Sequence, residues 1–377
     1  MTTSASQPIR VCAFGTADTE FDRGWILLEA LRESGAEMTY CHFDLWTKQR
    51  HKTGLAPWKW LLILVRYCLG LTYLSVRFIR SARCDVLYVG YMGHVDMVLA
   101  YCLNWRRRST LVFDPCISMY NTLVEDRKLV TAHGFVARVI RLLDEVPCRL
   151  ADVVLTDTLH HGKYFENALG VPRERIHRVF VGAGKPFQQA RWHAAEGPFT
   201  VLFYAKFSPL HGVLTILDAA RRLQGEEVCF TIVGGGQLEA AVRKEVHELD
   251  LPNLEWIQWL DTAALIERMR RCHVNLGIVG ATTKAEMVIP NKVFQALAMG
   301  VPVITRESPA IRELLDHGHS GILCEADDGA DLARAILQCK HDQDSLQMIG
   351  RNGREAFLQR ASHPAIARQF FEAVHAR

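Results

Sequence analysis

Two lysines and a glutamine in the second half of the chain have the types and spacing of an anion-binding site. Lys206 directly follows an apolar stretch typical of a buried strand, so we expect it at the carboxyl edge of a parallel sheet, where ligands bind in such folds. Lys292 falls in the first turn of a helix predicted over 291–299, where the helix dipole favours an anion. Gln295 shares its face and can hydrogen-bond a ribose hydroxyl. The lysines can neutralise a diphosphate; the alternative is an ordinary capped helix with a solvated lysine.

Glycines stand beside these residues. Gly212 lets the backbone come close to a ligand before a predicted helix, and Gly234 and Gly235 end a strand in the run VGGG. This run is not the GxGxxG of dinucleotide sites, and no acidic residue ends the following strand. The pattern therefore favours a phosphate-containing ligand other than NAD.

The first half of the chain also carries polar residues after predicted strands. Gly15 closes the first strand and opens a loop, which we expect to face a crevice between two domains. Asp22 and Arg23 follow in that loop, and Asp114 and Asp157 each end a later strand. His160 follows Asp157. Each of these is more often a cap or loop residue than a catalytic one. The candidates of this half for contact with a second ligand, on the side of the crevice opposite the lysines, are Asp22, Arg23, Ser118, Tyr120 and Asp157.

Nothing in the sequence indicates a metal or a disulfide framework. The eleven cysteines include no CxxC pair, so we interpret them as reduced thiols. A DxD triplet can hold a divalent metal, and the one such triplet, at 342–344, lies in a polar stretch that we interpret as a solvated loop. We therefore expect no metal and no cofactor.

Strands and helices alternate along the chain, which predicts parallel sheets with helices on both faces. We expect two Rossmann-like, doubly wound α/β domains, at 1–185 and 199–355, joined by an irregular linker over 185–199. Residues 356–377 are predicted to form a final helix that can cross back to the first domain. The predicted strands are 9–14, 84–90, 110–113, 151–156, 176–181, 200–204, 229–233, 254–257, 274–278 and 301–305.

The strand with Lys206 and Gly212, the VGGG turn and the block NKVFQALAMGVPVIT occur in an order and spacing that resemble glycosyltransferase family 4, which has the GT-B fold. The resemblance covers about 180 residues strongly and the first half loosely. It implies a retaining, metal-independent transfer of a sugar from a nucleotide-diphosphate sugar. The donor-binding residues it implies are Gly15, Lys206, Gly212, Gly234, Gly235, Asn291, Lys292 and Gln295. The catalytic candidates are Lys206, Lys292, Asp114 and Glu286.

The sequence departs from the family pattern at two places. Many members carry two glutamates eight positions apart around this helix; here the second is Gln295 and the first is Met287, with Glu286 beside it. Glu286 is the candidate replacement for the sugar-contacting carboxylate. Many members also place a histidine near the position of Asp114, which leaves the acceptor-side role open.

A basic, apolar stretch covers residues 45–83 and contains no acidic residue after Asp44. The segment 58–80 is long enough to span a bilayer, but Arg66 lies near its middle. Lys59, Arg66 and Arg77 fall in one narrow stripe, so we favour an amphipathic helix lying on an anionic membrane surface. The alternative is a helix packed on its sheet with an exposed arginine stripe.

Composition limits the function classes. The net charge of +3 gives no reason to expect a nucleic-acid partner, and 49% hydrophobic residues indicate a globular chain. The polar N-terminus lacks the apolar region of a secretory signal, so we expect a cytoplasmic enzyme, with the inner face of the plasma membrane as a peripheral site. The expected partners are a nucleotide sugar and a glycan or lipid-linked acceptor. The alternatives are a sugar-nucleotide epimerase, a catalytically silent nucleotide-sugar-binding subunit, and a transferase acting on a soluble small molecule.

Overall fold

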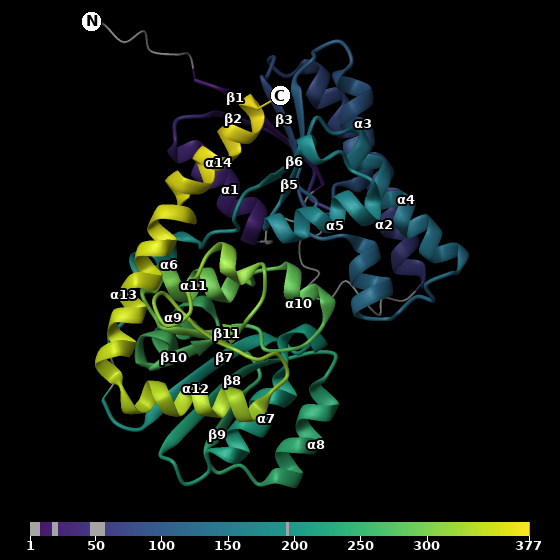
Figure 1. Ribbon diagram of the computed structural model, residues 1–377. Coiled ribbons are helices and arrows are strands. Elements are labelled where there is room, and N and C mark those ends of the chain that lie inside the picture. Colours follow the sequence, from purple (N-terminus) through teal and green to yellow (C-terminus); the bar gives the residue numbers. More distant parts are fainter. Residues whose placement is uncertain (1–7, 17–21, 46–56, 194–195, 377) are drawn as a thin grey trace, which may run out of the picture. The chain divides into compact units, whose positions relative to one another are not determined.

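The structure, a computed structural model, describes residues 8–16, 22–45, 57–193 and 196–376 (Figure 1). The chain forms two compact units. Unit 1 comprises the chain up to Val181 together with the C-terminal segment from Ile366, and unit 2 comprises Gly182–Ala365. Each unit is a Rossmann-like α/β fold, as the alternating pattern predicts. The crevice expected between two such domains stays a prediction.

The sheet of unit 1 has six parallel strands in the order β2-β1-β3-β4-β5-β6. Strands β3 and β5 are buried along their whole length, as expected for a parallel sheet covered on both faces. The strands are β1 (Arg10–Gly15), β2 (Glu37–His42), β3 (Val86–Val89), β4 (Thr110–Phe113), β5 (Val153–Thr156) and β6 (Ile176–Arg178).

The helices of unit 1 divide between the two faces of this sheet. Crossover connections are right-handed, so the helices that step successively from β2 to β6 share one face, and α1 lies on the other. A single core cluster joins Phe78 of α2, Met97 of α3, Cys148 of α4 and Phe165 of α5. The helices are α1 (Asp22–Glu33), α2 (Pro57–Arg80), α3 (His94–Asn104), the π-helix η1 (Asn121–Asp126), α4 (Phe135–Leu150), α5 (Leu159–Leu169) and α14 (His363–His375), with a short 3-10 turn η2 (Arg173–Arg175).

Unit 2 has a second six-stranded parallel sheet, in the order β12-β11-β10-β7-β8-β9. The strands are β7 (Phe199–Lys206), β8 (Val228–Gly235), β9 (Leu254–Ile257), β10 (Val274–Leu276), β11 (Val303–Arg306) and β12 (Ile322–Cys324). The helices are α6 (Lys185–Gln189), η3 (Pro209–His211), α7 (Val213–Arg222), α8 (Glu239–Leu249), α9 (Thr262–Arg271), α10 (Thr283–Met287), α11 (Asn291–Met299), η4 (Ile311–Glu313), α12 (Gly329–His341) and α13 (Gln343–Arg360).

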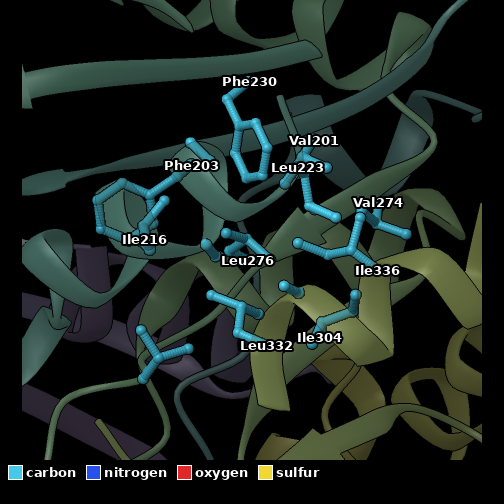
Figure 2. Packing of buried hydrophobic residues seen from close by; sticks show 14 of the residues in the cluster. Val201, Phe203, Ile216, Leu223, Phe230, Val274, Leu276, Ile304, Leu332 and Ile336 are labelled. Atoms are coloured by element: carbon cyan, nitrogen blue, oxygen red, sulfur yellow. The ribbon is translucent and has the colours of Figure 1, made fainter. Parts of the chain in front are cut away.

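The main core of unit 2 lies between its sheet and the helices α7 and α12 (Figure 2). Phe203 of β7, Phe230 of β8 and Leu276 of β10 point into it from the sheet, and Ile216 and Ile336 meet them from the helices. Apolar burial of this kind is the main stabilising term of the unit. It holds the central strands, and therefore their carboxyl ends, in fixed positions.

The sequence expectations needed four corrections. Strands β2 and β12 were not predicted: β2 is an edge strand with a polar, half-exposed pattern, and β12 has only three residues. The expected irregular linker over 185–199 contains helix α6, because Pro186 stands in its first turn, where a proline is tolerated. The 342–344 triplet is not a loop, since the Asp342 side chain caps α13 by accepting a hydrogen bond from Ser345 N.

We predict that Gly212 and Gly225 differ in tolerance to alanine although both have a positive φ, of 66° and 84°. A Cβ at Gly212 would lie 2.5 Å from the backbone nitrogen of Gly280, whereas a Cβ at Gly225 would meet nothing within 4 Å. Gly225→Ala should cost only the left-handed backbone penalty of about 1 kcal/mol. Gly212→Ala should cost clearly more. Urea unfolding of both variants measures the difference in the free energy of unfolding. Equal losses in the two variants would show that the backbone at Gly212 does not contact the loop that holds Gly280.

Candidate functional site

The candidate site of unit 2 lies where the order of its strands reverses. Strand β7 comes first in sequence, and the chain then adds β8 and β9 on one side and β10, β11 and β12 on the other. The loops after β7 and β10 therefore leave the sheet side by side, which is the position where ligands bind in open α/β sheets. The two loops meet there: Val279 N donates to His211 O at 3.4 Å.

Lys292 fills this position from the first turn of α11. Its side chain is buried, and its Nζ donates to Gly277 O at 3.2 Å and lies 3.9 Å from the ring centroid of Phe203. Within the described part of the chain, no carboxylate lies at ion-pair distance from this nitrogen. Burial therefore lowers the pKa of Lys292 well below its usual value. An anionic ligand at this place would supply the missing countercharge.

More basic side chains surround the loop after β10. The Nη1 atom of Arg306 donates to Gly280 O at 2.8 Å, and both Arg306 and Lys284 are buried. Neither residue was predicted as part of the site. The available signal was weak: Arg306 ends an apolar strand, as Lys206 does, and the burial of Lys284 depends on contacts that are distant in sequence. The loop is thus lined by buried cations.

His211 is a further residue that the sequence reading missed. It immediately precedes Gly212, and its Nδ1 is buried without a hydrogen-bond partner among the described atoms. Burial, followed by the charges of Lys292 and Lys284, lowers the pKa of His211 well below its usual value. The imidazole is therefore neutral in the unliganded protein at neutral pH and adds a hydrogen-bonding group to a cationic site.

The other predicted donor-side residues lie at the carboxyl ends of the same sheet. Lys206 ends β7 and is exposed, and Gly234 of the adjacent parallel strand β8 pairs with Ala205 of β7. A Cβ on Gly234 would lie 1.9 Å from Ala205 O, so only glycine fits. Gly235 follows it in β8, and Asn291 is the first residue of α11. The structure therefore brings these residues to one edge.

Gln295 was expected to share a face of the helix with Lys292, and the structure buries both side chains. All residues of the helix after Asn291 are buried, because α6 and α13 pack against it. The Gln295 Oε1 accepts a hydrogen bond from the Tyr204 hydroxyl at 2.8 Å. This contact orients the amide, so that its nitrogen remains as the group able to meet a ligand. The ribose role of Gln295 stays a prediction.

Glu286 is a half-exposed carboxylate of α10 beside the cationic loop. Arg306 Nη2 lies 3.4 Å from its Oε1, while the neighbouring Met287 is buried. The position of the family's first glutamate holds the buried Met287, so Glu286 beside it is the carboxylate next to this loop. Its role as the sugar-contacting group stays a prediction.

The charged candidates of unit 1 are paired with each other. Arg23 Nε lies 2.8 Å from Asp114 Oδ1, and Arg23 Nη1 donates to Val179 O at 2.9 Å. The Tyr88 hydroxyl donates to the same carboxylate at 3.1 Å. Burial lowers the pKa of Arg23, but Asp114, Cys116 and Asp157 together raise it above its usual value. As found here, Asp114 anchors α1 to the sheet, and its catalytic role stays a prediction.

The remaining unit 1 candidates also have local partners. Ser118 Oγ and Tyr120 N both donate to Asp144 Oδ2, at 2.7 and 2.8 Å, which fixes the loop after β4. Asp157 Oδ1 lies 2.6 Å from His161 Nδ1, so a residue of α5 holds this carboxylate, and the role of His160 stays a prediction.

Gly15 lies at the strand-order reversal of unit 1, between β1 and β3. It has a φ of 125°, and a Cβ there would lie 2.6 Å from Asp96 Oδ2. Thr16 N donates to the same oxygen at 2.6 Å. Gly15 is thus required by packing at this position, whether or not it contacts a donor. Asp22 is the first residue of α1, and its side chain lies outside the described residues.

Comparison with known proteins gives this geometry a context. Residues 184–356 match the sequence model of the family described as glycosyl transferases group 1. The chain is 28% identical over 177 residues to the amylovoran biosynthesis glycosyltransferase AmsK of Erwinia amylovora, covering 45% of this chain and 43% of that protein. It is 25% identical over 209 residues to the putative colanic acid biosynthesis glycosyltransferase WcaL of Salmonella typhimurium, covering 54% and 51%. The chain thus spans about half the length of these relatives.

The fold extends over the whole chain. The crystal structure of Anabaena Alr3699/HepE in complex with UDP is similar with a TM-score of 0.68 and 16% sequence identity, over 98% of this chain and 100% of that one. The fold class is therefore confirmed as the two-domain α/β arrangement of GT-B proteins.

We predict that Lys292→Met keeps or raises stability while it weakens binding of a nucleoside diphosphate. Burying an ammonium without a carboxylate costs free energy, which methionine avoids at similar volume. Because the pKa of Lys292 is lowered in the folded protein, the unfolded chain binds more protons below pH 10.5. Wild-type stability should therefore rise with pH toward that value, and Lys292→Met should lack this contribution.

Lys206→Met is the matched control, because Lys206 ends a strand at the same edge but is exposed. It should weaken diphosphate binding without the gain in stability. Thermal unfolding between pH 7 and 10 and calorimetric titration with UDP, GDP and ADP measure both effects. A marked loss of stability in Lys292→Met would contradict the idea that the site is built around an uncompensated charge.

Proposed function

This chain belongs to the glycosyl transferases group 1 through residues 184–356, and from that premise we propose that it is a retaining, metal-independent glycosyltransferase. Its donor is a nucleotide-diphosphate sugar, and its acceptor is a glycan or a lipid-linked glycan of polysaccharide biosynthesis. One observation carries the proposal most directly: Lys292 is buried at the strand-order reversal of the unit that matches the family, with no carboxylate at ion-pair distance among the described residues.

The donor assignment rests on charge and position. The diphosphate has two negative groups, and Lys206, Lys292 and Arg306 offer cations at one sheet edge. Charge-assisted hydrogen bonds of this kind are stronger than neutral ones, and more so in a partly dry site. HepE, which shares the fold, was crystallised with UDP, which supports a nucleoside diphosphate as the common ligand class.

The same cations suit the chemistry of the transfer. When the glycosidic bond to the diphosphate breaks, negative charge grows on the leaving oxygen. Lys292 and its neighbours are already fixed by backbone carbonyls, so they need no reorganisation as this charge develops. This arrangement supplies by side chains what a divalent metal supplies in other transferases, and it is the physical basis for proposing metal independence.

Polysaccharide assembly is the context that the relatives suggest. AmsK and WcaL are named for amylovoran and colanic acid biosynthesis. We place the enzyme in the cytoplasm, at the inner face of the plasma membrane, and assign the contact with anionic lipid to residues 45–83. Helix α2 within this segment is long and apolar enough to cross a membrane by length and composition. However, Leu74 and Phe78 lie in the core of unit 1, which favours a helix lying on the surface.

We predict that the purified chain releases the nucleoside diphosphate from one nucleotide sugar of a panel, and that EDTA leaves this activity intact. Thermal shift identifies the donor first, since a ligand at 100 times its Kd adds about 2.7 kcal/mol to stability. Lys206→Ala should then raise the donor Kd and lower turnover.

Three outcomes of this experiment would overturn parts of the proposal. Donor binding without any transfer to extracts of lipid-linked acceptor would indicate a catalytically silent subunit. Loss of activity with EDTA and recovery with Mn²⁺ would show that the metal-independent assignment is wrong. Activity on a soluble small-molecule acceptor alone would exclude the envelope role.

We predict that replacement of Lys59, Arg66 and Arg77 by Gln releases the protein from anionic vesicles and leaves donor affinity unchanged. Each basic residue near an anionic surface contributes about 1 kcal/mol, and salt screens this attraction. Raising the NaCl concentration from about 50 to about 500 mM shortens the Debye length from above 10 Å to below 5 Å. Wild-type binding should therefore fall steeply over this range. Sedimentation with vesicles measures it. Equal binding of the variant and the wild type would show that α2 does not contact the lipid.

A further inference from the structure

Helix α4 has an apolar outer face that its place in the fold does not require. Its inner side packs on the sheet through Ala137, Ile140 and Cys148. A helix in this position normally turns polar residues to water. Here Phe135 is 80% exposed and Leu142 is 57% exposed. The exposed apolar residues of α4 are Phe135, Val136, Val139, Leu142 and Leu143.

The neighbouring helices repeat this pattern. Helix α3 packs between α2 and α4, and Figure 1 shows the three on the same side of unit 1. Trp105, directly after α3, is 72% exposed. The other exposed apolar residues of α2 and α3 are Leu62, Leu64, Val65, Leu69, Tyr73, Val76, Ile79, Val95, Val98 and Tyr101. Three adjacent helices thus each present large apolar side chains to solvent, which marks an interaction surface.

The charges on this surface have one sign. Helices α3 and α4 contain three acidic residues, and Asp96 and Asp144 are buried. The third, Glu145, is enclosed by arginines, with its carboxylate 2.7 Å from Arg141 and 3.6 Å from Arg149. The exposed cations of the three helices and the turn after α3 are Arg66, Arg77, Arg80, Arg106, Arg108, Arg138, Arg141 and Arg149.

This combination selects the partner. A second copy of the chain would bring the same arginines against these arginines, and like charges oppose such a contact. A nucleic acid would match the arginines but offers no apolar phase for phenylalanine and leucine. An anionic bilayer offers both, since apolar side chains enter the acyl boundary and arginines stay at the phosphate level.

We propose that the outer face of α3 and α4 is a lipid-docking surface that binds an anionic bilayer, with α4 contributing its own anchor beside α2. This inference rests on the proposed membrane location but concerns different residues from those between 45 and 83. It makes the docking surface a plane formed by three helices, which fixes the orientation of unit 1 on the membrane. A single helix would leave the unit free to rotate about the axis of that helix.

The test compares two double variants in sedimentation with vesicles of phosphatidylglycerol and phosphatidylcholine. Phe135→Ser with Leu142→Ser removes the α4 anchor, and both residues are exposed, so the fold is retained. The partition coefficient should fall by about tenfold or more, because each large apolar side chain adds substantially to insertion. Met348→Ser with Leu358→Ser is the matched control: both are exposed apolar residues of α13 in unit 2, and vesicle binding should not change.

A charge variant tests the second half of the inference. Arg138→Gln with Arg106→Gln should weaken binding to anionic vesicles, flatten its salt dependence and leave the weak binding to pure phosphatidylcholine unchanged. Thermal unfolding of every variant should match the wild type. Donor affinity should also stay unchanged, since none of these residues lies in the donor site.

The outcomes separate this inference from the proposed function. If the α4 variants bind vesicles as the wild type does while the α2 triple variant does not, the α4 anchor is wrong and the membrane location stands. If the wild type binds no vesicle at low salt, both membrane proposals fail, and glycosyl transfer in solution still tests the enzyme. If the wild type forms a dimer that Phe135→Ser with Leu142→Ser dissolves, the face belongs to a second copy and the lipid inference is overturned.

Discussion

The burial of the Lys292 ammonium is the constraint from which the structure of unit 2 is best understood. An ammonium in a dry environment must donate hydrogen bonds to oxygen atoms, and the described residues around Nζ offer a carbonyl and an aromatic face. Gly277 O can reach the nitrogen only because β10 ends after Leu276 and the chain turns out of the sheet. Phe203 can lie beneath it because β7 is adjacent to β10. The position of the charge thus depends on the strand order.

Close approach of backbones keeps this charge in place. Three glycines stand where a Cβ would collide: Gly212 against Gly280, Gly280 against Pro209, and Gly277 against Thr305. The loops after β7 and β10 are therefore pressed together, and water is kept from the inner side of the lysine. Helix α11, buried along nearly its whole length, adds a rigid support. The result is a cation whose remaining stabilisation must come from the open side, where a ligand arrives.

The sequence could predict the frame of this site but only part of its chemistry. Strands β4 and β9 have the predicted bounds, because short β-branched runs between polar turns are characteristic of buried strands. Lys206 and Lys292 could be identified because each follows or opens a regular element. His211, Lys284 and Arg306 could not, since a basic residue at or near the end of an element is normally solvated and only tertiary packing buries these three. The edge strand β2 was missed because exposure on one side erases the apolar pattern.

The two units treat buried charge in opposite ways, and this contrast locates the anion. In unit 1 each buried candidate has its counterpart: Arg23 has Asp114, and Asp157 has His161. These contacts give each carboxylate a partner within the unit, although Arg23 Nη2 is buried without a hydrogen-bond partner among the described atoms. In unit 2, Lys292 has carbonyl and ring contacts, and Arg306 shares only the half-exposed Glu286. Both units have six-stranded parallel sheets, although their strand orders differ, so a parallel α/β sheet by itself does not explain the difference. A buried cation without a countercharge lowers the stability of the folded protein. An anionic ligand that binds beside it supplies the countercharge and raises the stability again, which explains why such a cation can be retained.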